Sequence, residues 1–410
     1  MTDRLFQGLL RGQNGDHRVT NVELFFDLVF VFAVTQLSHL LLEHLSWHGA
    51  FQTALLMLAV WYAWIDTAWV TNWLDPARRP VRVMLILLML VFMLVSATLP
   101  EAFHDRGLAF ALMFVLAQVG RTAFATYAMR EDRPLMLNFA RILSWLCLSG
   151  CFWIAGGIAH GSTRELLWVI ALIIDYLGPV SGFYVPVLGR STTHDWASIS
   201  GAHLAERCHL FIIIALGESI VMTGATFAGL TVGFWMFVTF LAAFCGSAAL
   251  WWIYFDRSAE IAAEEIARSD DPGRLGRSAY TYLHLPMVAG IIVTAVGDEL
   301  SISHPTHRGT AAAALVICGG PALFLLGHGL FKYAVWKRVS IPRVIAIGAL
   351  LLLIPVGMVA PLVLTALVST AVVLGVIAWD TASVAHGVIR SSYPRLEPAE
   401  SEKSPPFEHG

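Results

Sequence analysis

The sequence contains little charge. Only 13% of its 410 residues are Asp, Glu, Lys or Arg, whereas 57% are hydrophobic. Soluble globular proteins carry about 25% charged residues, so this composition excludes an ordinary soluble protein. The net charge is −3 and there is no tract of Lys and Arg. We therefore expect no nucleic-acid partner, because such surfaces are strongly basic.

Cysteine and catalytic motifs are also scarce. The five cysteines all lie in apolar segments, without a CxxC pair and without His/Cys neighbours at metal-ligand spacing. Buried thiols that behave as small hydrophobes are the expected arrangement. The sequence has no HExxH motif, no phosphate-binding loop and no recognisable Ser/His/Asp set. We therefore predict no enzyme activity, no catalytic residues, no metal and no cofactor.

Long apolar runs are abundant, and they recur at the length of about 20 residues that a helix needs to cross a bilayer. They predict an all-α polytopic transmembrane bundle of about twelve spans. The predicted spans are 22–43, 51–73, 81–101, 107–130, 139–159, 164–188, 203–225, 233–256, 279–299, 309–335, 342–359 and 362–387. The last two are separated only by the turn around Pro361, so their boundaries are the least sharply defined.

Lys and Arg are distributed unevenly among the loops. With a cytoplasmic N-terminus, the inside segments hold 21 of the 26 Lys and Arg, the outside loops hold 3, and Arg121 and Arg207 fall within spans. Cytoplasmic loops of membrane proteins are enriched in these residues. We therefore expect a multi-pass protein of the cell inner (plasma) membrane, surrounded by the lipid bilayer, with both termini cytoplasmic.

The two halves of the chain echo each other. Matching pairs are "ELFFDLVFVFAV" with "ERCHLFIIIALGES", "WYAWID" with "WWIYFD", and "RGLAFALMFVLA" with "RGTAAAALVICG". They fall in the first and seventh, second and eighth, and fourth and tenth spans. Since six spans per half insert both halves the same way up, a parallel repeat is expected. The predicted organisation is a cytoplasmic N-terminal segment (1–20), two six-helix repeats (21–190 and 191–390) and a disordered cytoplasmic tail (391–410).

Several stretches resemble the bacterial low temperature requirement A (LtrA) family of membrane proteins. They are "VELFFDLVFVFAVTQLSHLL", "WIDTAWVTNWLDP", "LPEAF", "HLAERCHLFIIIALGESIV", "WWIYFD", "YLHLPMVAGI" and "LFLLGHGLFK", and they extend over nearly the whole chain. The resemblance implies a membrane fold but no chemistry, because the family name records a growth phenotype. One departure is that Thr67 and Ala68 follow Asp66 where the family pattern has a further acid. A fainter likeness joins "FFD", Phe25–Asp27, to two-repeat lysosomal-type potassium channels.

Acidic residues form a stripe on two of the spans. At 100° per residue, Glu23 and Asp27 share one face of the first span, and His203 and Glu206 share one face of the seventh. A stripe that faced lipid would cost several kcal/mol per charge, so these residues should face protein or water.

These acids also lie at a shallow depth. Given a rise of about 1.5 Å per residue, five acids lie within about 10 Å of the cytoplasmic helix ends: Glu23, Asp27, Asp66, Glu206 and Asp256. Two roles stay open: capping of helix starts, and attraction of cations into a vestibule between the halves, with Glu23 and Asp27 beside Glu206.

Three charged residues lie deeper. Glu218, Asp175 and Arg121 are roughly 13–20 Å from both membrane faces by the same helical rise. Charges at this depth pair with each other or line a pathway. We expect Glu218 to be the functional carboxylate, with Arg121 or Asp175 within hydrogen-bond reach.

Midplane charges beside broken helices are typical of transporters. Gly178-Pro179 and "CGGP" at Cys318–Pro321 break two spans, so we predict a secondary transporter or exporter of a small solute or ion. The alternatives are a cation channel and a non-transport sensor or lipid-handling factor linked to growth in the cold. The sequence specifies neither the solute nor the oligomeric state. The candidate pathway residues are Glu218, Arg121, Asp175, Glu23, Asp27, Asp66, Glu206, Arg207, Asp256 and His203.

Overall fold

The computed structural model describes residues 8–11, 18–192, 199–231, 233–256, 258–267 and 272–385. All regular elements within these residues are helical, apart from three isolated β-bridges. The predicted all-α class is therefore confirmed. The predicted disordered tail (391–410) lies outside the described residues, as does most of the N-terminal segment 1–20.

The helices follow one another with short connections. The first half of the chain contains α2 (Asn21–Glu43), α3 (Trp47–Trp73), α4 (Arg79–Thr98), η1 (Leu99–Glu101), α5 (Gly107–Ala128), α6 (Arg133–Ile158) and α7 (Gly161–Val180). The second half contains α8 (Gly201–Ala228), α9 (Phe234–Phe255), α10 (Ser258–Ala267), α11 (Pro272–Leu275), η3 (Gly276–Tyr282), α12 (His284–Ser303), α13 (Ala311–Trp336), α14 (Ile341–Gly357) and α15 (Leu362–Ala385).

Ten helical stretches in the described residues are long and apolar enough to span a membrane. They contain α2, α3, α4, α5, α6, α8, α9, α12, α13 and α15. The other two long helices also coincide with predicted spans. However, α14 is too short at 17 residues, and α7 carries three charged residues, Arg164, Glu165 and Asp175. The chain is thus a multi-pass helical membrane protein.

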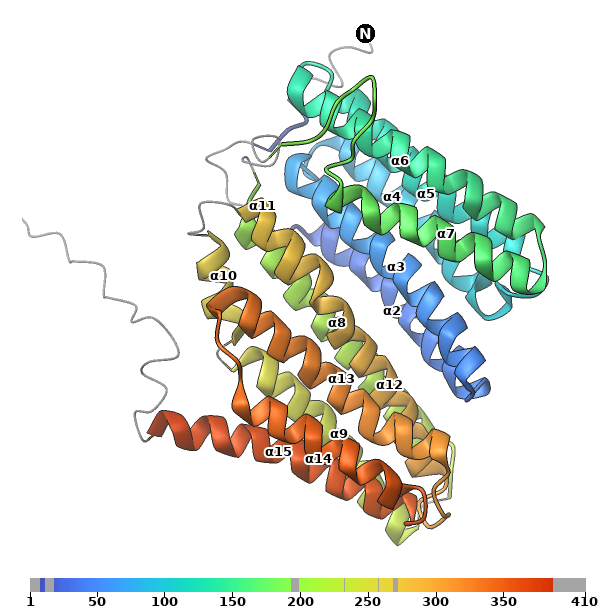
Figure 1. Cartoon of the computed structure of the whole chain (residues 1–410), viewed down its shortest axis with the longest axis vertical. Coiled ribbons are helices and arrows are strands. Elements are labelled where there is room, and N and C mark those ends of the chain that lie inside the picture. Colours follow the sequence, from blue (N-terminus) through green and yellow to red (C-terminus); the bar gives the residue numbers. More distant parts are fainter. Residues whose placement is uncertain are drawn as a thin grey trace, which may run out of the picture.

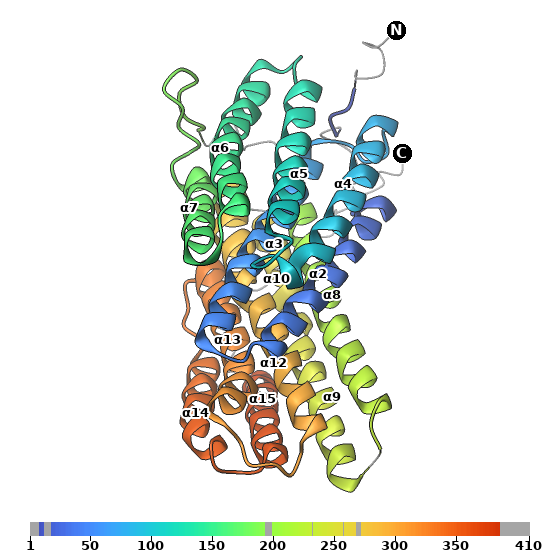
Figure 2. The ribbon, with the colours of Figure 1, turned by 90° about the vertical axis from the view of Figure 1, so that its right-hand side faces the viewer.

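The long helices lie side by side and form two groups (Figures 1 and 2). The first group is α2–α7 and the second is α8–α15, and the two meet where α2 and α3 contact α8 and α12. We call the end of the bundle at which α2 begins the proximal end, and the opposite end the distal end. Helix α8 and the stretch formed by α11, η3 and α12 begin at the proximal end, and α3 ends there.

Helix contacts follow the same order in both groups. In the first group, α2 contacts α3 and α4, α4 contacts α5, α5 contacts α6, α6 contacts α7, and α3 contacts α5 and α7. In the second group, α8 contacts α9 and α12, α12 contacts α13, α13 contacts α14, α14 contacts α15, and α9 contacts α13 and α15. If α8 is matched with α2, α9 with α3 and α12 with α4, each of these contacts of the first group has a counterpart in the second. The second group has three more contacts between its long helices, of α9 with α12, α12 with α15 and α13 with α15.

Helix α3 forms the centre of the molecule. In its most apolar window 83% of the residues are buried, because helices of both groups surround it. Trp61 and Trp64 are 1% and 0% exposed, and both pack against Phe211 of α8, with ring centroids 5.4 and 4.3 Å away. Large aromatic surfaces therefore join the first group to the second.

Glycines allow α12 and α13 to approach closely. A Cβ on Gly290 would lie 2.4 Å from the backbone nitrogen of Phe324, and one on Gly320 would lie 2.5 Å from that of Thr294. Small residues at such crossings let two helix backbones touch, which is how helices gain packing energy in a bilayer.

We predict that Gly320→Ala destabilises the protein by about 1–3 kcal/mol, the range for overpacking a tight contact, because its methyl group would overlap the α12 backbone. The measurement is the melting temperature of purified protein in detergent. Gly319→Ala is the matched control, since a Cβ on the neighbouring Gly319 meets nothing within 4 Å. Equal melting temperatures for the two variants would contradict this account of the crossing.

Candidate functional site

A buried charge cluster joins α2 to α8 near the proximal end. It consists of Arg11, Glu23, Asp27, His203 and Arg207. The last four are 0% exposed. Burial of so many ionisable groups is tolerated only when each charge has close partners, because removing an ion from water costs several kcal/mol.

Arg207 of α8 is the central cation of the charge cluster. Its Nη1 lies 3.2 Å from Glu23 Oε1, and its Nη2 lies 2.6 Å from Asp27 Oδ1. The indole nitrogen of Trp64 donates a second hydrogen bond, of 2.8 Å, to the same oxygen of Asp27. Side chains from α2, α3 and α8 thus meet at one point.

Glu23 has further partners at the surface side of the charge cluster. The Arg11 Nη2 atom is 3.0 Å from each Glu23 carboxylate oxygen, and His203 Nε2 is 2.9 Å from Oε1. Arg11 Nε also donates to the carbonyl of Thr71, at 2.9 Å. Arg11 therefore closes the cluster and holds the end of α3.

Local sequence fixes the position of Glu23. The backbone nitrogen and the hydroxyl of Thr20 both donate to Glu23 Oε2, at 2.9 Å each, which forms a capping box at the start of α2. The sequence raised this capping role as one option. The other, attraction of cations into a vestibule, does not fit two fully buried carboxylates whose charges Arg207 and Arg11 already answer.

The two remaining shallow acids lie outside the charge cluster. Glu206 accepts a 3.1 Å hydrogen bond from the backbone nitrogen of Val19. Asp256 is exposed and follows the last residue of α9. The repeated positions of Glu23 and Glu206 therefore carry different contacts.

A second buried ion pair joins α3 to α5. Arg121 Nη2 bonds to Asp66 Oδ2, and its Nη1 donates to Thr67 Oγ1 at 2.9 Å and to Gln118 Oε1 at 2.7 Å. Arg121 was expected to pair with Asp175 or Glu218, and this expectation is wrong. Asp66 satisfies the arginine because α3 and α5 are neighbours in the first group.

Asp175 and Glu218 form no ion pair with Arg121 among the described residues, although Asp175 lies within electrostatic range of it. Asp175 Oδ2 accepts a 3.0 Å hydrogen bond from the indole of Trp153. Glu218 is 2% exposed, and neither of its oxygens has a hydrogen-bond partner among the described residues. It lies on the face of α8 that packs against α2 and α12, with Thr35 and Glu299 as polar neighbours. The predicted contact with Arg121 or Asp175 is therefore absent from the described structure.

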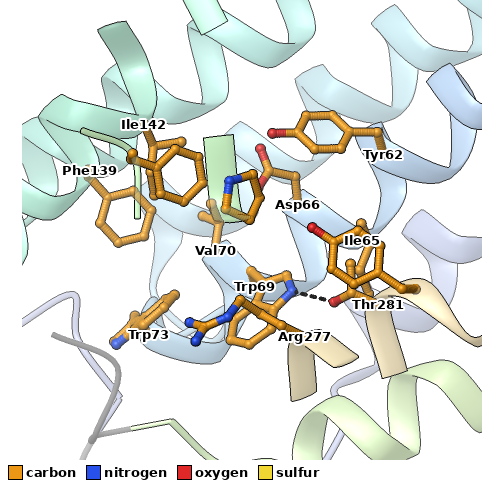
Figure 3. A pocket seen from close by; sticks show the side chains of 13 residues that line it. Tyr62, Ile65, Asp66, Trp69, Val70, Trp73, Phe139, Ile142, Arg277 and Thr281 are labelled. Carbon is orange, nitrogen blue, oxygen red and sulfur yellow. Dashed lines mark hydrogen bonds between the residues drawn. The ribbon is translucent and has the colours of Figure 1, made fainter. Parts of the chain in front are cut away.

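A pocket lies between α3, α6, the end of α7 and η3 (Figure 3). Its empty space is about 490 Å³, including the part that is open to solvent. Its walls are mainly aromatic, from Tyr62, Trp69, Trp73, Phe139, Phe183 and Tyr282. The polar groups among its lining residues include the Asp66 carboxylate, the Arg277 guanidinium and the Thr281 hydroxyl, and Asp66 and Arg277 lie apart within the lining.

Contacts across the boundary between the two groups hold the pocket in shape. The indole of Trp69 donates to Thr281 Oγ1 at 3.1 Å (Figure 3), and that of Trp61 donates to the Thr281 carbonyl at 2.8 Å. Thr281 lies in η3, a seven-residue π-helix. Single π-helical turns occur frequently at functional sites, because they re-aim side chains within a helix.

Several of these residues were missed at the sequence level. Trp69 and Trp73 follow Asp66 by three and seven positions, so helical spacing places all three on one face and was a usable signal. Arg277 and Tyr282 gave no such signal, since their placement depends on the π-helical turn.

We predict that Arg207→Met alone sharply reduces the yield of folded protein. It would leave Glu23 and Asp27 without their shared cation, and breaking a buried ion pair costs about 3–5 kcal/mol. Adding Glu23→Gln and Asp27→Asn should restore much of the yield, measured as the monodisperse fraction in size-exclusion chromatography. Arg79→Met, at an exposed arginine, is the control. An Arg207→Met protein as abundant and heat-stable as this control would refute the assigned role.

Comparisons with known proteins agree with the fold and the motifs. The sequence model of the bacterial low temperature requirement A protein (LtrA) family matches residues 18–378. A curated protein of Rhizobium meliloti (strain 1021), described as uncharacterized, is 42% identical over 336 residues, which is 81% of this chain and 80% of that protein. No solved structure matches. Since the match runs from just before α2 into α15 and covers most of the chain, the chain belongs to the LtrA family of bacterial membrane proteins.

Proposed function

We propose that this protein is a secondary transporter or exporter of a small organic solute, and that the aromatic pocket is its solute site. The observation that carries this proposal is the position of the pocket. Helices α3, α6 and α7 of the first group and η3 of the second group line it together. In transporters built from two halves, a site between the halves is exposed to either side in turn as the halves rock.

The chemistry of the lining defines the solute class. Aromatic walls favour a flat apolar body. Arg121 bonds to Asp66 Oδ2, so the other carboxylate oxygen of Asp66 can receive an amino group, while Arg277 can receive a carboxylate. We therefore propose a zwitterion with an aromatic or similarly apolar body.

The residues that line the pocket suit a site that binds and releases a solute without covalent chemistry. The residues that line the pocket include no Cys, His or Lys, and the Thr281 hydroxyl already accepts a hydrogen bond from Trp69. General acid–base or nucleophilic catalysis needs a nucleophile beside a base. We therefore propose that the protein is not an enzyme.

The proposed topology has twelve spans in two parallel repeats, with α7 and α14 crossing the membrane beside the ten longer or more apolar stretches. Two observations support it. Each helix contact of the first group has a counterpart in the second, and the Lys and Arg residues are concentrated in the loops at the proximal end. In this topology the protein lies in the inner membrane. Its proximal end and both of its termini face the cytoplasm.

Three compounds that share one ring test the pocket. We predict that phenylalanine binds more tightly than phenethylamine or phenylacetate, because it alone can use both charges. Trp69 and Trp73 report binding through tryptophan fluorescence. Asp66→Asn should weaken phenethylamine and Arg277→Gln should weaken phenylacetate, each by about tenfold or more, as expected when a charged hydrogen bond is lost. Asp105→Asn, at an exposed acid, is the control. Purified protein that responds saturably to none of the three would sink the proposed solute class.

Epitope tags test the topology. A tag between residues 257 and 277 and a tag after Arg390 should be inaccessible to antibody in intact cells, whereas a tag between residues 300 and 308 should be accessible. All three should react once the cells are permeabilised. Surface labelling of the 257–277 tag would overturn the proposed orientation.

A further inference from the structure

Glu218 is a buried carboxyl group that the solute pocket does not use. It lies on α8 ten residues before Ala228, so it is about 15 Å from the distal end of that helix, given a rise of about 1.5 Å per residue. It is 2% exposed, and neither oxygen has a hydrogen-bond partner among the described residues. A bare carboxylate in such a place is costly, so its oxygens need a proton or a cation.

Two further titratable groups lead from Glu218 to the distal end. Glu299 of α12 lies within electrostatic range of Glu218, and His39 of α2 lies within range of Glu299. Glu299 is four residues before the end of α12, and His39 is four residues before the end of α2. Both are partly exposed and lie about 6 Å from the distal helix ends by the same rise.

Hydroxyl groups accompany His39 on α2. Thr35, Ser38 and His39 share one face of α2 because they are three and four positions apart. The Thr35 hydroxyl donates to the Val31 carbonyl at 3.0 Å and also lies beside the Glu218 carboxyl group. The Ser38 hydroxyl is 1% exposed and has no hydrogen-bond partner among the described residues.

The donor set favours a proton over a metal ion. No group of three or more His, Cys, Asp and Glu that could hold a metal occurs among the described residues. Asp298, the neighbour of Glu299 on α12, points about 100° away around the helix. The titratable groups that face Glu218 are therefore Glu299 directly and His39 behind it.

We propose that His39, Glu299 and Glu218 form a proton path from the distal end to the interior of the bundle, with Glu218 as the proton-binding site that is coupled to transport. This inference rests on the proposed function. The solute pocket lies in the proximal half of α3, so proton and solute would enter from opposite ends. The helices of the proton path, α2, α8 and α12, contact α3 of the solute pocket, and such an arrangement suits exchange of an external proton for an internal solute.

Infrared difference spectroscopy of the full-length protein in lipid tests the site without any solute. Acidic minus alkaline spectra should contain a protonated-carboxyl band that Glu218→Gln removes and that Glu43→Gln, at an exposed acid of α2, leaves intact. His39→Gln should keep the band but slow its response to a pH change. An unchanged band in Glu218→Gln would overturn the proposal. Gln is nearly isosteric with a protonated Glu, so folding should be preserved.

A second measurement links the site to transport. Wild-type proteoliposomes that contain the pH dye pyranine should show proton flux when phenylalanine is added on one side. Glu218→Gln should still bind phenylalanine by tryptophan fluorescence but should lose this proton flux. Proton flux at the wild-type rate in Glu218→Gln would refute the coupling role. Failure of the wild type to bind phenylalanine would instead refute the proposed solute class, and the infrared result would stand on its own.

Discussion

The pairing of Arg207 with Glu23 and Asp27 is the interaction on which the arrangement of the two groups depends. All three side chains are 0% exposed, and they come from helices that are far apart in the sequence. In a bilayer there is no hydrophobic force between apolar helices, because lipid tails are equally apolar. Buried charges with matched partners therefore give α2 and α8 a single relative position.

The same interaction indirectly positions the aromatic pocket. Arg207 also donates to the Thr71 hydroxyl at 3.2 Å, and Arg11 donates to the Thr71 carbonyl. Thr71 is next to the pocket-lining residues Val70 and Trp73 on α3. A displacement of α8 against α2 would therefore be transmitted to the last turn of α3 and to the aromatic walls. The charge cluster and the pocket form one mechanical unit at the proximal end.

Much of the fold could be predicted from hydropathy, since the apolar runs mark the helices with small errors at their ends. The acids on α2 were also expected to face protein, because lipid would be too costly. Their partner was not expected, although Arg207 stands within the seventh span. Arg121 was assigned to the wrong carboxylates because depth alone was used, and depth does not identify neighbouring helices.

The pocket and the row of residues at the distal end were predicted even less completely. The lining by Arg277 and Tyr282 depends on a π-helical turn, which has no simple sequence pattern. Glu299 in "AVGDELS" is an acid near the end of a predicted span, and it attracted no attention beside the deeper Glu218. Pairings between distant helices are set by packing, so a single sequence contains little information about them.

The distance along the chain between the partners of the charge cluster has a consequence for biosynthesis. Asp27 and Arg207 are separated by 180 residues. At about 5–20 residues per second, roughly 9 to 36 seconds pass between the synthesis of the two. During this time α2 carries two acids without their main cation, and it has to stay close to water or to the insertion machinery. The acids of the first span thus obtain their main cation only when the seventh span has been synthesised.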